Sequence, residues 1–184
     1  MSFDIATYLA DPEDLALRTG VDAANTLLLL RLRQATNRFR AAVGYPVSLQ
    51  VDDVYFISGR GGSALLLPGR PIVGDPVVEV DGTAVTDFQV GRRSGALRRD
   101  AGWADGLENI KVTYTHGYLD IPEDIQEAVL DVASLVMGGL IAGVESITTG
   151  DESVKFTSGT AASGVTQTWV DAVSRHANGT GEDT

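Results

Sequence analysis

Two stretches with helical periodicity enclose a middle region with the pattern of short strands, and this order constrains the fold most. Apolar residues recur at three- and four-residue spacing over residues 22–43 and again over 122–142. Over residues 47–116, short apolar runs alternate with turn signals, and Asp81-Gly82 predicts a two-residue hairpin turn. The order predicts a mainly α fold with a β insertion (α+β). In it, an antiparallel helical core carries a small antiparallel β-hairpin region and an extended C-terminal tail.

The ends of the helices are marked by residues with known capping preferences. A short helix over residues 11–19 has Asp11 at its N-cap position and Gly20 at its end. A second helix is expected to open at Asp22 and to close at Gly44. We expect this second helix to pair with the long helix that follows the β region.

The chain of 184 residues is long enough for one domain and a tail. We expect residues 1–156 to form the domain and residues 157–184 to form a flexible linker and a C-terminal docking segment. The linker "TSGTAASGVTQ" contains little that a core could bury. After it, "QTWVDAVSRH" places Trp169, Val170 and Val173 on one side. Trp169 can either fold back on its own domain or anchor in the groove of a partner.

Charge and cysteine content exclude several classes of protein. The net charge of −11 argues against sequence-independent binding of nucleic acid, and the absence of cysteine excludes disulfides, iron–sulfur clusters and thiolate zinc sites. No apolar run is long enough to span a membrane, and no signal peptide is expected. Two arginine clusters indicate solvated faces or subunit contacts, with DNA contact as the alternative. They comprise Arg31, Arg33, Arg38 and Arg40, and Arg92, Arg93, Arg98 and Arg99.

His116 is followed by a group of acids, Asp120, Glu123 and Asp124, which raises the question of a catalytic or metal site. A closed zinc site needs three or four ligands, and the spacing of two histidines on one helix face is absent. Neither a Gly-x-Ser-x-Gly motif nor a phosphate loop occurs. We therefore expect no catalytic residue, no metal and no cofactor. His116 is interpreted as a structural residue at a strand end, and the acids as charges at a helix start.

Leucines and a tryptophan are the candidates for contact between subunits. Leu27, Leu29 and Leu30 widen the apolar stripe of the second helix beyond one face, which indicates contact on two sides, with other elements or with another subunit. Trp103 lies in a turn-rich stretch between strands. It either covers the small β core at the end of a hairpin or contacts a neighbouring subunit.

Several motifs, taken in order, resemble the head-to-tail adaptors (head–tail connectors) of tailed bacteriophages. The resemblance covers about residues 11–156 and is carried by four stretches. They are "LLLPGRPIVGDPVVEVDGTAV" (65–85), "GALRRDAGW" (95–103), "VTYTHGYLDIPEDIQEAVLDVAS" (112–134) and "ESITTGDESVKF" (145–156).

The resemblance implies a structural virion protein without enzymatic activity. It implies a ring, usually of twelve copies, which lies beneath the portal protein in the virion neck and joins the DNA-filled capsid to a stopper or other tail-side neck protein. Double-stranded DNA would pass through the ring without specific binding, and no membrane partner is implied. The protein would be in the host cytoplasm during assembly. The C-terminal segment with Trp169, Val170 and Val173 would meet the portal, and no residue is assigned to the channel.

Two alternatives remain from other classes. One is a small acidic enzyme that uses His116 with Asp120 or Glu123. The other is a different neck or tail-completion protein, such as a stopper, or a non-viral oligomeric binding module. Stopper proteins tend to be small and mostly β, so the order helix, β insertion, helix favours the adaptor.

Overall fold

The structure is a computed structural model that describes residues 4–137, 146–149, 152–155 and 165–177. The chain forms two compact units. The helical unit is built from both ends of the chain, residues 1–44 and 121–184, and the β unit is the continuous segment 45–120. The β unit is thus an insertion between the two long helices.

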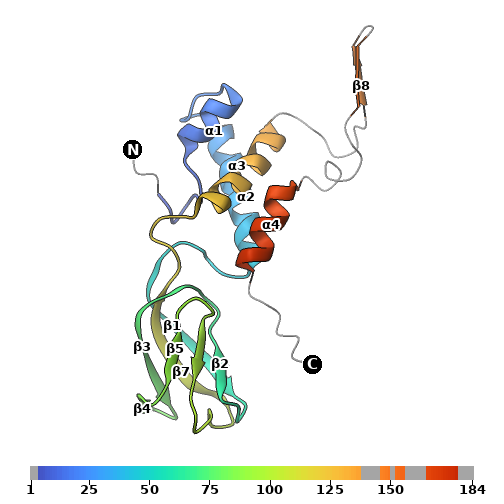
Figure 1. Ribbon diagram of the computed structural model, residues 1–184. Coiled ribbons are helices and arrows are strands. Elements are labelled where there is room, and N and C mark those ends of the chain that lie inside the picture. Colours follow the sequence, from blue (N-terminus) through green and yellow to red (C-terminus); the bar gives the residue numbers. More distant parts are fainter. Residues whose placement is uncertain (1–3, 138–145, 150–151, 156–164, 178–184) are drawn as a thin grey trace. The chain divides into compact units, whose positions relative to one another are not determined.

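The described part of the helical unit contains four helices (Figure 1). They are α1 (Pro12–Thr19), α2 (Thr26–Val43), α3 (Glu123–Met137) and α4 (Gln167–His176). Helices α2 and α3 contact each other, and each of them also contacts α1 and α4. The predicted pairing of the two long helices is confirmed.

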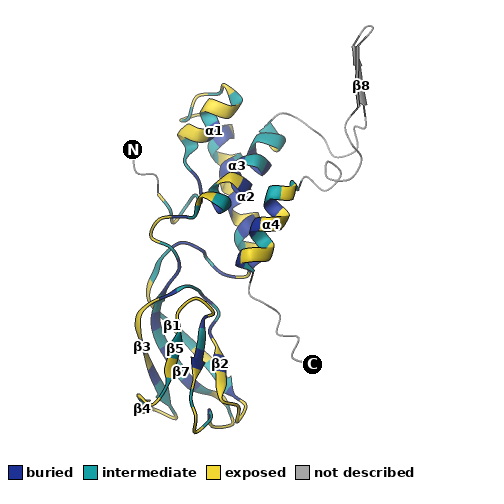
Figure 2. Cartoon of the chain, in the orientation of Figure 1, coloured by how far each residue is buried: buried dark blue, intermediate teal, exposed yellow. Residues whose placement is uncertain are grey.

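The helices pack through apolar positions at helical spacing. In α2 the buried residues include Leu28, Leu32 and Phe39, and in α3 they include Ile125 and Val129. Figure 2 shows these helices with buried positions on one side and exposed positions on the other. Each fully buried leucine or phenylalanine contributes roughly 1.5–3 kcal/mol relative to an exposed one. This burial holds the helical unit together.

The helix ends follow the capping chemistry, with one correction. The Asp11 side chain accepts a hydrogen bond from the Glu13 N–H, and Gly20 ends α1 in the left-handed conformation, as expected. However, the prediction that Asp22 opens the second helix is wrong. The helix begins at Thr26 because Asn25 caps it, whereas the Asp22 carboxylate accepts a hydrogen bond in the preceding turn. The long helix after the β region was expected to continue to residue 142, and residues 138–142 lie outside the described residues.

The β unit contains two antiparallel sheets. The larger has the strand order β1-β7-β3-β4 and the smaller the order β2-β6-β5. The strands are β1 (Gln50–Gly59), β2 (Ala64–Leu66), β3 (Ile72–Val80), β4 (Thr83–Val85), β5 (Gln89–Gly91), β6 (Ala96–Arg98) and β7 (Gly106–His116). Asp81 and Gly82 both have positive φ between the paired residues Val80 and Thr83, so the predicted hairpin turn is confirmed.

The β unit has a core of its own. Leu65 and Leu97 come from the smaller sheet, and Val78, Ile110 and Val112 come from the larger one. Trp103 belongs to the same buried cluster. The insertion therefore folds around its own apolar residues.

The expectation of a mainly α fold is wrong. Strands occupy a share of the described residues comparable to that of the helices, and β1 and β7 contain 10 and 11 residues. The sequence suggests shorter strands because outward-facing polar residues interrupt the apolar runs. In addition, a register shift around Pro76 divides β3. The fold is α+β with a substantial two-sheet β unit.

Two further strands, β8 (Ser146–Thr149) and β9 (Glu152–Lys155), form an antiparallel pair. Among the described residues, none of the helices combines the length and the apolar character that a membrane crossing requires.

Candidate interaction surfaces

The side of α2 that faces away from its packed neighbours carries exposed leucines. The side chain of Leu27 is 50% exposed and that of Leu30 is 38% exposed, whereas Leu28 between them is buried. Arg33 is also exposed. We call Leu27, Leu30 and Arg33 the α2 outer face. Of the three leucines proposed for subunit contact, Leu29 is half-buried and the other two are accessible.

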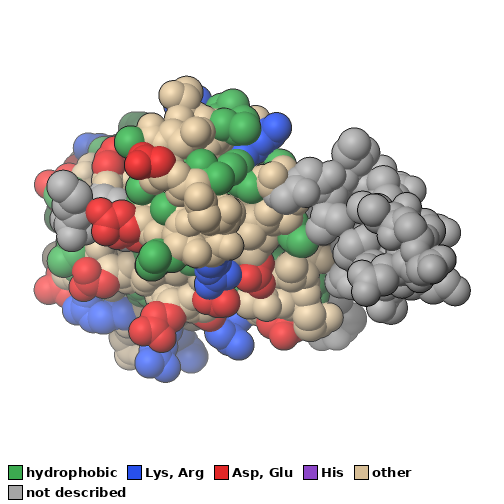
Figure 3. All heavy atoms as spheres, turned by 90° about the horizontal axis from the view of Figure 1, so that it is seen from above, with side chains coloured by type: hydrophobic (Ala, Val, Ile, Leu, Met, Phe, Trp, Pro, Cys, Tyr) green, Lys and Arg blue, Asp and Glu red, His purple; other side chains and the backbone are tan. Residues whose placement is uncertain are grey.

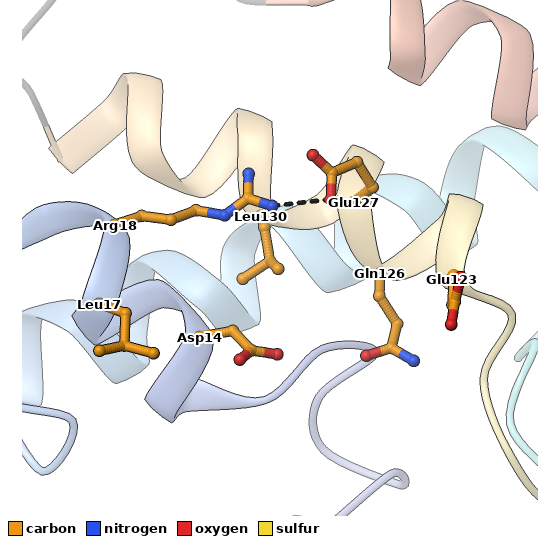
Figure 4. Close-up of a pocket in the computed structure, with 7 residues that line it drawn as sticks. All are labelled: Asp14, Leu17, Arg18, Glu123, Gln126, Glu127 and Leu130. Carbon is orange, nitrogen blue, oxygen red and sulfur yellow. Dashed lines mark hydrogen bonds and ion pairs between the residues drawn. The ribbon is translucent and has the colours of Figure 1, made fainter.

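A groove of about 490 Å³ lies between α1 and α3 (Figure 4). We call it the α1–α3 groove. It is lined by Asp14, Leu17, Arg18, Glu123, Gln126, Glu127 and Leu130. The Arg18 guanidinium binds the Glu127 carboxylate at 2.7 Å and the Asp131 carboxylate at 2.9 Å. One cation thus meets several carboxylates, and the lining is acidic on balance.

Charges of both signs occur on the molecular surface. Figure 3 shows acidic and basic side chains interspersed on the face seen there, with hydrophobic side chains among them. The net charge of −11 is therefore an average over a surface that also carries local positive charge.

Helix α4 packs against the helical unit through Trp169. The indole is 5% exposed, and its ring meets the Phe39 ring edge-on with the centroids 5.2 Å apart. Val170 is 45% exposed and Val173 is half-buried. This geometry favours the interpretation in which Trp169 folds back on its own domain. Most of the predicted linker before α4, residues 157–164, lies outside the described residues.

Asp124 joins the first turn of α3 to the end of α4. Its carboxylate accepts a hydrogen bond from His176 Nε2 at 3.0 Å and pairs with Arg175. Partial burial opposes ionisation, but the hydrogen bonds from His176 and Arg175 outweigh it and hold the pKa of Asp124 below 3.8. Asp124 therefore fixes a helix in place.

Trp103 is enclosed within the β unit. The side chain is 1% exposed, its Nε1–H donates to the Leu97 carbonyl at 3.3 Å, and its ring lies 6.0 Å from the Phe88 ring. An enclosed indole offers no area to a neighbouring subunit. The candidate role of Trp103 in subunit contact is thus replaced by its role in the β core.

His116 lies at the end of β7 and is fully buried. Its Nε2 is 3.2 Å from Asp53 Oδ2, and its ring lies 4.8 Å from that of Tyr114. The backbone of Gly69 lies so close to the imidazole that a Cβ added to Gly69 would be 2.1 Å from His116 Nδ1. His116 is sealed from substrate and packs the strand end against this loop.

The electrostatics around His116 also fit a structural role. Partial burial raises the pKa of Asp53, but hydrogen bonds from His116 and Tyr55 outweigh it and the pKa is lowered. Burial and the hydrogen bond to Asp53 raise the pKa of Tyr55 to about 12. The carboxylate that His116 meets is that of Asp53, rather than Asp120 or Glu123. In the described part of the chain, no group of three or more acidic or histidine side chains is arranged to hold a metal.

One apolar surface was not anticipated from the sequence. Val54, Phe56, Val73 and Val77 are all exposed on the larger sheet, and Val54 and Val77 flank Thr113 in register. A signal was present in "VYFI", residues 54–57, because an uninterrupted apolar run is typical of a strand covered on both faces. Here Tyr55 and Ile57 pack inward and the alternate residues face outward.

The sequence matches no protein-family model and no curated protein. The structure is similar to a chain from the solved neck of an empty GTA (gene transfer agent) particle, computed with C6 symmetry. The match has a TM-score of 0.53 at 14% sequence identity and covers 91% of this chain and 92% of that chain. The two chains share a fold. The shared fold extends over most of the length of both chains.

Proposed function

We propose that this protein is a head-to-tail adaptor of a tailed phage or phage-like particle. Copies of the chain, twelve in our proposal, form a ring beneath the portal in the virion neck. The ring joins the DNA-filled capsid to the next neck protein, and DNA passes through it. The observation that carries this proposal is the shared fold with a neck chain over nearly the full length of both chains.

The surfaces of the chain support a role in assembly rather than in catalysis. Exposed leucines on α2 and exposed valines and a phenylalanine on the larger sheet give the chain apolar surface on both units. Apolar patches of this kind mark sites of protein contact. The side chain with the most plausible catalytic chemistry, His116, is fully buried beneath the Gly69 backbone. A net charge of −11 per copy, repeated around a ring, keeps DNA from adhering during passage.

The C-terminal helix is the proposed contact with the portal. Trp169 holds α4 in place, Val170 offers the accessible apolar surface, and Val173 lies half-buried on the same helix. Because the buried indole already holds α4 in place, the exposed side of this helix can bind a partner without the entropic cost of ordering the helix.

A binding assay with the portal protein of the same particle tests this function. The purified chain should bind portal rings as a defined number of copies, measured by native mass spectrometry. Val170→Asp should lower the affinity at least tenfold. Val136→Asp, at an equally exposed valine of α3 (41% against 45%), should leave it unchanged. If the unsubstituted chain does not bind portal rings, the adaptor function is wrong.

A further inference from the structure

Helix α2 differs in charge from the acidic chain as a whole. Helix α2 contains four arginines and no acidic residue, whereas the whole chain has a net charge of −11. Arg33 is exposed on its outer face and has no hydrogen bond or ion pair among the described residues. Leu27 and Leu30 lie beside it on the side opposite Leu28 and Phe39. The α2 outer face thus combines apolar and basic character.

The α1–α3 groove has the opposite charge. Arg18 is engaged by Glu127 and Asp131, so the Asp14 and Glu123 carboxylates have no cation within the described helices. Figure 4 shows Asp14 and Leu17 projecting from α1 and Glu123 from α3 around the same cavity. The Leu17 side chain is 85% exposed. The groove therefore combines apolar and acidic character.

The two surfaces point in different directions. The buried positions of α2 face α1 and α3, so the α2 outer face points away from the helices that form the groove. One chain cannot join its own two surfaces. Two identical chains can, if the outer face of one meets the groove of the next.

We propose that the α2 outer face of each copy docks into the α1–α3 groove of the neighbouring copy. Arg33 lies against Asp14 and Glu123 of the neighbour, and Leu27 and Leu30 cover its Leu17. This inference rests on the proposed ring and names the surfaces that close it.

The charges also determine the mode of contact. A symmetric contact of the α2 outer face with itself would bring the Arg33 side chains of two copies together, and like charges across an interface oppose association. Contact between two different faces avoids this repulsion and is the kind of contact that generates a ring. The arrangement is therefore head-to-tail.

Disulfide cross-linking tests the contact directly, because the chain contains no cysteine. The double variant Leu17→Cys/Leu27→Cys, assembled on the portal or at high concentration and then oxidised, should give a ladder of covalent oligomers on a denaturing gel. Each single variant should remain monomeric. A ladder supports the proposal, and its absence overturns it. Dimers from Leu27→Cys alone would indicate symmetric contact and would also overturn it.

Charge reversal sharpens the test and supplies the controls. In the double-cysteine chain, Arg33→Glu or Glu123→Arg should lower the yield of cross-linked oligomers at least tenfold, and the two reversals together should restore it. The matched control is Arg60→Glu, at an exposed arginine of the β unit, which should leave the yield unchanged. Unchanged yields with Arg33→Glu would overturn the proposed pairing.

The outcomes separate this inference from the adaptor function. Portal binding without a ladder would leave the adaptor function standing and remove the proposed contact. A ladder without portal binding would support the contact and remove the adaptor function.

Discussion

The helical unit gathers its core from both ends of the chain, whereas the β unit gathers its core from one continuous segment, residues 45–120. In the helical unit, α2 and α3 are separated in sequence by the whole insertion, and α4 closes the unit from the C-terminal side. In the β unit, two sheets enclose Trp103 and its neighbours without help from the rest of the chain. The difference indicates that a core substitution should mainly disturb the unit in which it lies.

Trp103→Ala should have the largest effect and should be confined to the β unit. It removes a fully enclosed indole and leaves a cavity, so we expect a loss of about 4 kcal/mol in the free energy of unfolding. Hydrogen exchange should show lost protection in β1, β3 and β7, with α2 and α3 still protected. Leu107→Ala, at a leucine that is 88% exposed, is the control. Equal loss of protection in both units would contradict the expectation that a core substitution mainly disturbs its own unit.

Trp169→Ala should disturb the helical unit instead. The substitution removes the contact with Phe39 and should cost about 3 kcal/mol, since α4 is held on one side only. Hydrogen exchange should increase first in α4 and then in α2, while the β unit keeps its protection. Unchanged exchange in α4 would show that Trp169 does not fix this helix.

Gly69→Ala tests the close contact around His116 in the β unit. The added Cβ would overlap the imidazole, which is buried and cannot move aside, so we expect a cost of roughly 1–3 kcal/mol. Gly62→Ala, at a glycine with open space around it, should be close to neutral. The cost of Gly69→Ala should fall in a His116→Ala background, as measured by a double-mutant cycle in urea. If Gly69→Ala cost the same free energy of unfolding with His116 and with His116→Ala, the strain would not come from contact with the imidazole.

Acid should weaken the attachment of α4 through Asp124. Because the folded-state pKa of Asp124 is below 3.8, its contribution is complete above pH 3.8 and is lost as the pH falls through the lowered value. Asp124→Asn should cost about 1 kcal/mol at pH 7 and should remove this part of the acid dependence. Exchange in α4 measured against pH tests the effect. An unchanged acid dependence in the variant would assign it to another carboxylate, with Asp53 of the β unit the first to examine.

Local chemistry made much of the helical unit predictable from the sequence. Apolar spacing and the caps at Asp11, Gly20 and Gly44 identify the helices, because these signals act within a few residues. The sequence does not locate the start of α2, because Asp22 and Asn25 are both capable caps and only the backbone conformation shows that Asn25 caps the helix.

The β unit was harder to predict because its order depends on pairing between distant residues. The Asp81-Gly82 hairpin is local, so the sequence predicts it, but β1 pairs with β7 across the whole insertion. The partner of His116 illustrates the same limit, since Asp53 approaches it only through that pairing, while Asp120 and Glu123 were merely close in sequence. Likewise, Leu17 becomes part of the α1–α3 groove only when the two helices meet.

The central proposal is that copies of this chain form a ring in the neck of a particle. Cryo-electron microscopy of the purified chain mixed with portal rings tests it most directly. We expect a collar of identical copies on one side of the portal, each with the helical unit and the β unit seen here, around an open channel. Portal rings without added density, with the chain left as free monomers, would contradict the claim.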